Sequence, residues 1–318
     1  PVTETASWTH QYYLTVNSPY DTPGGAGWYN ENDTAYATLT DGTVSGGTRT
    51  QYVFTGWTDD ASGTNLTSDP ITMNAPKTAT ADWKTQYWLD TDTNYGTVTP
   101  NDGWYDAGSV VTIQATAPTP GTGEQYLWNG WTGTGTISYS GTDNPATNAV
   151  TMNSPVTETA SWTHQYYLTV NSLYDTPGGE GWYDENDTAY ATLTDGTVSG
   201  GTGTQYVFTG WTGDASGSGL TSDPITMNAP KTATTDWRTQ YYLTVTSPYG
   251  LPTTGEGWYD EGDTAYAGLN TGSESSYLFV EWTGDASGTD YSQSDLITMS
   301  GPKTATANWA EIRVQNYG

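Results

Sequence analysis

The chain has 318 residues, with 35 acidic against 7 basic side chains, a formal net charge of −28, 15 Trp and no Cys. This charge argues against nucleic-acid or anionic-lipid partners, because both require clustered Lys and Arg. The absence of Cys excludes thiol chemistry, and no stretch approaches the ~20 apolar residues of a membrane span.

Residues 1–10 predict a β-strand that closes a repeat. Their sequence, Pro-Val-Thr-Glu-Thr-Ala-Ser-Trp-Thr-His, is identical to that of residues 155–164. We therefore expect the chain to be a segment of a longer array that begins inside a repeat. The alternative is a free strand that completes the sheet of a neighbouring subunit by β-augmentation.

Residues 11–85 predict an all-β unit with five short strands. Apolar and polar residues alternate with a period of two, and the Thr, Gly and aromatic content disfavours helix. In the first strand Leu14 shares a face with Tyr12 and Val16. In the third, Trp57 is expected on the face opposite Phe54. The predicted strands are Tyr12–Val16, Thr34–Leu39, Gln51–Trp57, Ile71–Met73 and Thr78–Trp83.

The unit is repeated four times. Residues 165–239 differ from residues 11–85 at nine positions, and two more divergent copies lie between and after them. Such tandem repetition predicts an array of small units that stabilise one another. The predicted organisation is a closing strand (1–10), repeat 1 (11–85), repeat 2 (86–164), repeat 3 (165–239), repeat 4 (240–311) and a tail that matches no copy (312–318).

The motifs around the tryptophans resemble a known family. An aromatic run ending in Gly56-Trp57 is followed by Ile71-Thr72-Met73 and by a strand that ends in Trp83. This pattern resembles the divergent internalin-type B-repeat over residues 1–311. The resemblance implies tandem β-grasp-like or β-sandwich repeats in an elongated array, in secreted or cell-wall proteins of bacteria and archaea, with no shared active site. One departure is Glu281, which replaces the Gly before Trp in repeat 4.

The tryptophans recur at equivalent positions, which favours packing over a sugar-binding platform. A residue present in every copy should have a role that every copy shares, and packing of the core is such a role. Each buried aromatic ring removes 150–250 Å² of surface from water. We therefore expect three classes of core Trp. Trp88 and Trp128 occur in repeat 2 alone and are better candidates for a local contact. The recurring positions are Trp28, Trp104, Trp182 and Trp258; Trp57, Trp131, Trp211 and Trp282; and Trp8, Trp83, Trp162, Trp237 and Trp309.

Calcium is the metal that the acidic loops favour. Pairs of Asp flank Gly/Ser-rich loops, and calcium takes six to eight oxygen ligands from such loops. Against this, no Asp-x-Asp-x-Asp-Gly pattern is present, and repeat 2 lacks the equivalent residues. The candidate ligands are Asp60 with Asp69, Asp214 with Asp223, and Asp285 with Asp295.

Other chemistry receives little support. Recurring carboxylates occur in turn-like sequences, so we predict no enzyme activity. Three sequons are candidate N-glycosylation sites in an exported protein, at Asn32, Asn65 and Asn186. A Lys–Asn crosslink is a weaker candidate at Lys77, Lys231 and Lys303, because repeat 2 has Val156 at that position.

The function that fits best is structural. Repeats 1 and 3 agree even in their loops, which favours a uniform building block over specialised binding. We expect the repeat region of an extracellular surface protein, a stalk, sheath or filament, that associates with itself or with neighbouring repeats through edge strands. The alternative is an adhesin or carbohydrate-binding module that recognises surface glycans.

Overall fold

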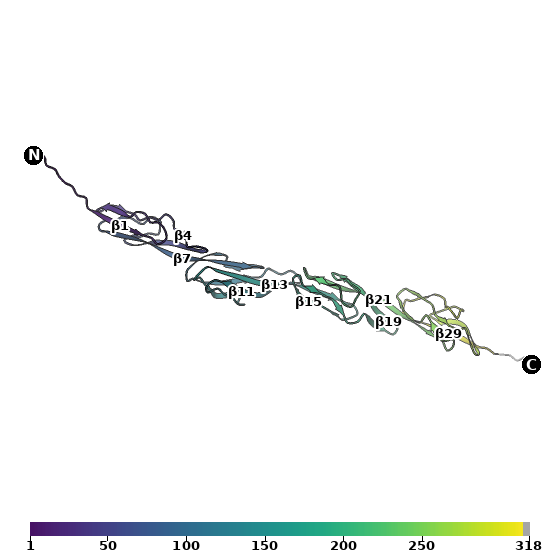
Figure 1. Ribbon diagram of the computed structural model, residues 1–318. Helices are drawn as coiled ribbons and strands as arrows, with labels where there is room; N and C mark the ends of the chain where they lie inside the picture. Colours follow the sequence, from purple (N-terminus) through teal and green to yellow (C-terminus); the bar gives the residue numbers. More distant parts are fainter. Residues whose placement is uncertain (314–318) are drawn as a thin grey trace, which may run out of the picture. The chain divides into compact units, whose positions relative to one another are not determined.

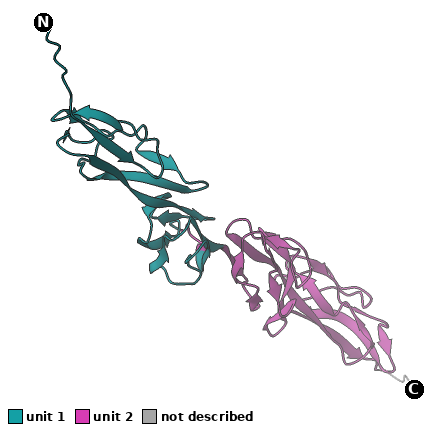
Figure 2. Ribbon diagram, turned by 60° about the vertical axis from the view of Figure 1, so that its left-hand side comes forward, with its two compact units in different colours: residues 1–119, 126–163 teal, residues 120–125, 164–318 magenta. Residues whose placement is uncertain are grey.

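The computed structural model describes residues 1–313, which contain strands and turns and no helix. Two compact units are distinguished: residues 1–119 with 126–163, and residues 120–125 with the chain from 164 onward (Figure 2). The all-β fold expected from the sequence is therefore confirmed. Residues 314–318, most of the predicted tail, lie outside the described part.

Repeat 1 is built on a five-stranded sheet with the order β2-β1-β7-β5-β4. The first and last strands of the repeat, β1 and β7, are parallel neighbours at the centre, from Leu14↔Lys77 to Asn17↔Thr80. All other pairs are antiparallel. This is the strand order of a β-grasp sheet. The strands are β1 (Gln11–Asn17), β2 (Gly27–Asn30), β4 (Thr43–Ser45), β5 (Thr50–Asp59) and β7 (Lys77–Thr93).

A small second layer covers one face of this sheet. Two short antiparallel strands, β3 (Thr34–Ala35) and β6 (Ile71–Thr72), hold Ala35 and Ile71 against the sheet. With Leu14, Met73 and Trp57 these residues form the buried core of the repeat. Thus a repeat of 75 residues has its own core, and four such clusters occur along the chain.

Repeat 2 has a four-stranded sheet of order β9-β7-β13-β11, without a counterpart of β4 among the described residues, and a larger second layer, a three-stranded sheet of order β12-β10-β8. Val111, Ile113 and Val150 are buried in it. The strands are β8 (Thr97–Thr99), β9 (Gly103–Asp106), β10 (Val110–Thr116), β11 (Glu124–Thr134), β12 (Ala146–Thr151) and β13 (Val156–Asn171).

Repeats 3 and 4 return to the plan of repeat 1. In repeat 3 the strands are β14 (Pro177–Gly178), β15 (Gly181–Asp184), β16 (Thr188–Ala189), β17 (Thr192–Leu193), β18 (Thr197–Gly201), β19 (Thr204–Gly213), β20 (Ile225–Thr226) and β21 (Lys231–Thr246). In repeat 4 they are β22 (Thr253–Thr254), β23 (Gly257–Asp260), β24 (Thr264–Ala265), β25 (Gly268–Leu269), β26 (Ser273–Glu274), β27 (Tyr277–Gly284), β28 (Ile297–Thr298) and β29 (Lys303–Glu311).

The closing strand of one repeat runs without a break into the first strand of the next. β7, labelled in Figure 1, pairs with β5 over Ala79–Tyr87 and then with β9 over Gln86–Leu89. β13 and β21 continue across the next two repeats in the same way. The predicted boundaries at 85/86, 164/165 and 239/240 therefore lie inside the strands β7, β13 and β21.

A bulge corrects the predicted alternation in the third strand. The register of β5 against β7 shifts between Phe54 and Gly56, so one extra residue is inserted. Phe54 and Trp57 therefore point to the same side, where their rings meet edge to face at 5.5 Å. The prediction that they lie on opposite faces is wrong. Glu281 occupies the same bulge in β27, which accepts a side chain there.

The number and length of the strands also differ from expectation. β2 and β4 were not predicted, since Gly-Trp-Tyr and Thr-Val-Ser are too short to show a period. The predicted strand Thr34–Leu39 is reduced to Thr34–Ala35, with Thr38 in isolated bridges. The buried face of the first strand is confirmed, because Leu14 and Val16 are buried and Tyr12 packs against the same core.

Candidate functional site

Each repeat carries one pair of aromatic rings on its first hairpin, in which the second ring is an exposed Trp and the first is exposed in repeat 1 and half-buried in the others. The pairs are cross-strand neighbours, so that Tyr13 lies opposite Trp28 in β1 and β2. Ring centroids are 5.1–5.3 Å apart and the rings meet edge to face. The four pairs are Tyr13–Trp28, Trp88–Trp104, Tyr167–Trp182 and Tyr242–Trp258.

These exposed rings overturn part of the predicted packing. Trp28 is 66 % exposed, and its equivalents Trp104, Trp182 and Trp258 are 37 %, 40 % and 40 % exposed. The reason is the alternation of the first strand: Leu14 faces the core, so Tyr13 and its cross-strand partner face solvent. Trp8 is also exposed.

The other tryptophans do pack as expected. Trp57 and its three equivalents are buried in the four cores, and Trp83, Trp162, Trp237 and Trp309 pack against them. Trp128 packs beside Trp131 and Trp162, and Trp88 belongs to an exposed pair. The exposed tryptophans are therefore Trp8 and the four on the second strand of each first hairpin, Trp28, Trp104, Trp182 and Trp258.

Hydrogen bonds fix two of the exposed pairs in place. The hydroxyl of Tyr242 donates to Glu256 Oε1 at 3.0 Å, and that of Tyr167 donates to Glu180 Oε1 at 2.9 Å. These carboxylates raise the pKa of both tyrosines above its ordinary value, because a hydrogen bond to an anion favours the protonated phenol. The phenols therefore remain neutral hydrogen-bond donors at neutral pH.

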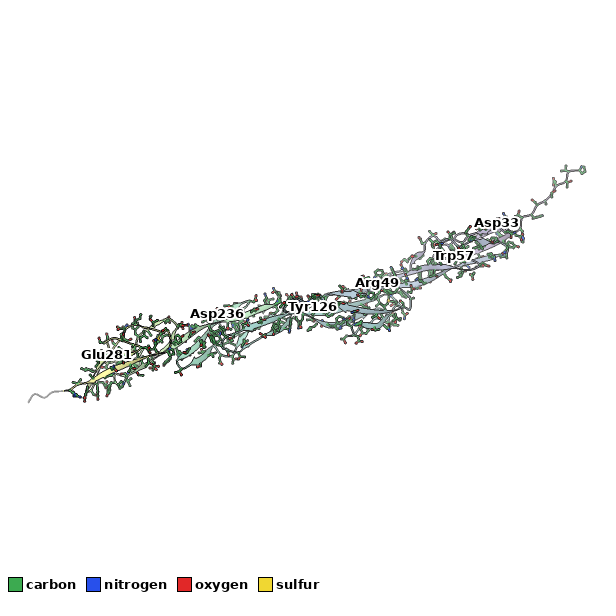
Figure 3. The ribbon with its side chains drawn as sticks, turned by 180° about the vertical axis from the view of Figure 1, so that it is seen from behind. Asp33, Arg49, Trp57, Tyr126, Asp236 and Glu281 are labelled. Carbon is green, nitrogen blue, oxygen red and sulfur yellow. The ribbon has the colours of Figure 1, made fainter. Side chains whose placement is uncertain are left out.

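A hairpin of the preceding repeat docks beside three of these pairs. The backbone N–H of Trp88 donates to Arg49 O at 3.0 Å, and that of Tyr242 donates to Gly203 O at 2.9 Å. In the same way the backbone N–H of Tyr167 donates to Gly123 O at 2.9 Å. All three carbonyl residues have positive φ, which explains Gly at two of them. Arg49, labelled in Figure 3 with Trp57, directly precedes β5, and Trp57 lies near the far end of that strand.

Arg49 gives the junction between repeats 1 and 2 a charged contact. Its guanidinium lies 2.8 Å from Asp90 Oδ2 and also donates to Thr157 Oγ1 at 3.1 Å. At the equivalent junction between repeats 3 and 4, Gly203 has no side chain to fill this space. The two junctions share the backbone hydrogen bond, but only the junction of repeats 1 and 2 has a charged side chain at this position.

A groove lies at the junction of repeats 3 and 4. Its volume is about 340 Å³, and the β18–β19 hairpin and the indole of Trp258 line it. The remaining lining is polar and uncharged: Thr197, Ser199, Gly201, Gly203, Thr204 and Gln205.

The wall of this groove is held by a chain of hydrogen bonds. Gln205 Nε2 donates to Gln240 Oε1 at 2.8 Å, and Gln240 Nε2 donates to Asp260 Oδ1 at 2.7 Å. Arg238 donates to the other oxygen of Asp260 at 3.1 Å. The amide orientation of Gln205 is therefore fixed from behind the groove.

Two larger hollows lie within repeats 2 and 3, and a smaller one of about 250 Å³ in repeat 4 is lined by residues that include Tyr249 and Glu274. One of about 410 Å³ in repeat 2 is lined by Thr91, Asp92 and Asp102, among others. Asp102 Oδ1 already accepts hydrogen bonds from the backbone and hydroxyl of Thr91. The other, of about 570 Å³ in repeat 3, is lined by residues that include Leu173 and Asp236. Neither combines an exposed aromatic ring with unpaired polar groups.

The predicted calcium ligands have partners within the chain. Asp60 accepts from Thr78 N at 2.9 Å and from Lys77 Nζ at 3.1 Å, and these contacts hold its pKa below the ordinary value. Asp69 accepts from Ser62 Oγ at 2.8 Å. The equivalent aspartates repeat this pattern: Asp214 with Lys231, Asp223 with Ser216, Asp285 with Lys303, and Asp295 with Ser287.

These contacts give the acidic loops a structural role. Among residues 1–313, no three His, Asp or Glu side chains gather as a metal site would require. The calcium hypothesis therefore stays a prediction without an assembled ligand set. The lysines proposed for a crosslink form ion pairs with Asp60, Asp214 and Asp285.

The three sequon asparagines are exposed. Asn32 and Asn186 occupy tight turns with φ of 67° and 69°, where Asn is favoured. Asn65 offers its backbone carbonyl to Trp57 Nε1 at 3.1 Å, which leaves its side chain at the surface. Glycosylation at these positions stays a prediction.

Glu158 is a buried carboxyl group that the sequence did not lead us to expect. It is fully buried on β13, where the other repeats have Ala79, Ala233 and Ala305. Tyr139 N donates to its Oε1 at 2.7 Å, and its Oε2 has no partner among the described residues. Burial raises the pKa of Glu158 to about 7. The sequence did contain one indication of this site, because Glu158 replaces an Ala that recurs in the other three repeats.

Comparison with known families identifies the repeats. A model of the divergent InlB B-repeat domain matches residues 21–86, 90–165 and 241–313. The chain belongs to the divergent InlB B-repeat family. The resemblance seen in the sequence is thus confirmed for three repeats, and residues 165–239 differ from repeat 1 at nine positions. Searches of curated proteins and of solved structures gave no match.

Family membership sets the general context. InlB B-repeats occur in secreted and surface proteins of bacteria and are typically non-catalytic. In residues 1–313 there is no helix of the length and apolarity that a bilayer requires.

Proposed function

We propose that these InlB B-repeats are a load-bearing spacer in an extracellular surface protein, such as a stalk or sheath. The observation that carries this proposal is the parallel pairing of the strands at which the chain enters and leaves a repeat. In repeat 1 these are β1 and the first half of β7, paired from Leu14↔Lys77 to Asn17↔Thr80.

This pairing determines how a repeat responds to tension. Parallel strands carry the chain in at one end of the sheet and out at the other, so a pull along the chain acts along both strands. The hydrogen bonds between them are then loaded together in shear instead of opening one after another. The ion pair between Lys77 and Asp60 at the start of this pairing adds a side-chain contact to the same edge.

Single-molecule stretching of the full chain tests this function. We expect four abrupt unfolding events, each releasing about 250–270 Å of extended chain for a repeat of about 75 residues. Extension without abrupt events, or a single event for the whole chain, would contradict the proposal. Forced unfolding reports the unfolding rate, which shear loading should make slow.

A filament subunit is the second candidate, and one observation favours it. Residues 1–10 lie outside any strand, while the identical residues 155–164 lie almost wholly in β13. Sedimentation velocity of the chain with and without residues 1–10, each with and without millimolar calcium, separates the candidates. Large species that require residues 1–10 support a filament; a monomer in every condition supports the spacer.

A further inference from the structure

We propose that the groove beside Trp258 binds a segment of neutral polysaccharide whose sugar rings carry equatorial hydroxyls. β-1,4-linked glucose and N-acetylglucosamine chains are of this class. The inference goes beyond the spacer function and does not depend on it. Three features of the groove support it.

The first feature is a rigid, exposed aromatic face. Trp258 is 40 % exposed, and Tyr242 meets it edge to face at 5.1 Å, a contact that restricts the motion of the indole. Tyr242 is itself held by Glu256. A ring fixed before binding loses little conformational entropy when a ligand arrives. Its electron-rich face attracts the polarised C–H groups that an equatorially substituted sugar ring presents.

The second feature is the polar lining opposite the ring. Thr197, Ser199 and Thr204 provide hydroxyls that both donate and accept. The carboxamide of Gln205 is oriented by Gln240, so its Nε2 is engaged and its oxygen remains an acceptor. Alternating donors and acceptors match sugar hydroxyls, which also do both.

The third feature is the charge. No Asp, Glu, Lys or Arg lines the groove, while the chain as a whole carries −28. An anionic glycan would be repelled by this field and would find no basic partner. The volume of about 340 Å³ lies within the range of small-ligand sites, so a neutral segment fits both in charge and in size.

A matched control exists within the chain. Trp28 occupies the equivalent position in repeat 1 and is even more exposed, at 66 %. It lacks the wall opposite the ring, because among the described residues no hairpin of a preceding repeat docks beside Tyr13. Binding that needs the whole groove will depend on Trp258 and not on Trp28.

Affinity electrophoresis of the full chain provides the test, in gels containing hydroxyethyl cellulose, glycol chitin or polygalacturonate. We expect retardation by one of the two neutral polymers and none by the anionic one. Titration calorimetry with the matching hexasaccharide then compares variants. Trp258→Ala should weaken binding about tenfold or more, as loss of an aromatic anchor does. Trp258→Phe should retain binding within about threefold, and Trp28→Ala should leave it unchanged.

A second substitution guards against a folding defect. Ser199→Glu places a charge at an exposed position of β18, where the fold should tolerate it, and should abolish binding to the neutral polymer. Circular dichroism and thermal unfolding verify that each variant is folded. Absence of retardation in both neutral gels, equal losses in Trp28→Ala and Trp258→Ala, or preferential capture of a proline-rich peptide would each overturn the proposal.

Discussion

The same ten residues occur twice in this chain in opposite environments. In residues 155–164, Val156 and Trp162 are buried, at 1 % and 9 % exposure. In residues 1–10, Val2 and Trp8 are 92 % and 94 % exposed. Since the local sequence is identical, the difference lies in the neighbours: β13 has β7 and β11 beside it, whereas residues 1–10 have no strand partner within residues 1–313.

This contrast shows that the closing strand is formed by tertiary contacts. Val156–Ala160 pair in parallel with Leu89–Thr93, and these long-range bonds cannot form in an isolated segment. β-propensity describes how well a residue fits a half-buried, pleated surface, and that surface must first exist. Identical positions in the two segments therefore provide internally controlled tests.

The largest expected effect on the free energy of unfolding is at Trp162. Trp162→Ala should lower the free energy of unfolding of repeat 2 by about 3–5 kcal/mol, because it removes a large side chain from a packed core. Trp8→Ala should change it by less than about 0.5 kcal/mol. Urea unfolding followed by fluorescence measures both. Similar losses in the two variants would mean that residues 1–10 are packed in solution.

The next effect depends on pH. The folded-state pKa of Glu158 is raised from 4.5 to about 7, so the folded state binds its proton more tightly than the unfolded chain does. Stability from this group is complete below about pH 4.5 and is lost as the pH rises to about 7. At about 1.4 kcal/mol for each pKa unit, the loss is on the order of 3 kcal/mol.

Glu158→Gln tests this effect, because it keeps the shape and removes the titration. The variant should be more stable than the parent by about 1–3 kcal/mol at pH 8, with the difference disappearing near pH 4.5. Glu4→Gln, at the identical position in residues 1–10, should leave stability unchanged. Thermal unfolding from pH 4 to 8 provides the comparison. A pH-independent difference would mean that Glu158 does not change protonation on folding.

The smallest effect concerns a side-chain hydrogen bond. Asn129 Nδ2 donates to Thr163 Oγ1 at 2.9 Å, across β11 and β13. Thr163→Val should lower the free energy of unfolding by about 0.5–1.5 kcal/mol, the usual net value of such a bond. Thr9→Val, its counterpart, should be neutral. An Asn129→Ala, Thr163→Val double-mutant cycle would show no coupling if the bond is absent in solution.

Much of the fold was predictable because the strands show a period of two in the local sequence. Leu14 and Val16 share one face of a strand with a period of two, so their burial follows from the pattern. The bulge at Gly56 breaks the period by one residue and is invisible to it. The continuation of β7 past Thr85 was also not predicted, because the sequence does not show that the last strand of one repeat and the first strand of the next are a single strand.

The candidate site was harder to predict because recurrence does not distinguish the two faces of a sheet. Trp28 recurs as faithfully as Trp57, yet one faces solvent and the other the core. The burial of Leu14 already implied that Tyr13 faces outward, but the pairing of Tyr13 with Trp28 requires the hairpin register. The groove beside Trp258 required more still, because its two walls come from different repeats.

The uninterrupted strands have a consequence for how the chain folds. Because β7 and β21 each serve two repeats, a strand that chose the wrong partner hairpin would misassemble two units at once. Repeats of high identity make such errors easier, since their strands are interchangeable. In this chain the two near-identical copies, 11–85 and 165–239, are separated by one with a different second layer and a buried Glu158. The two near-identical copies are therefore not neighbours, an ordering that discourages exchange of strands between them.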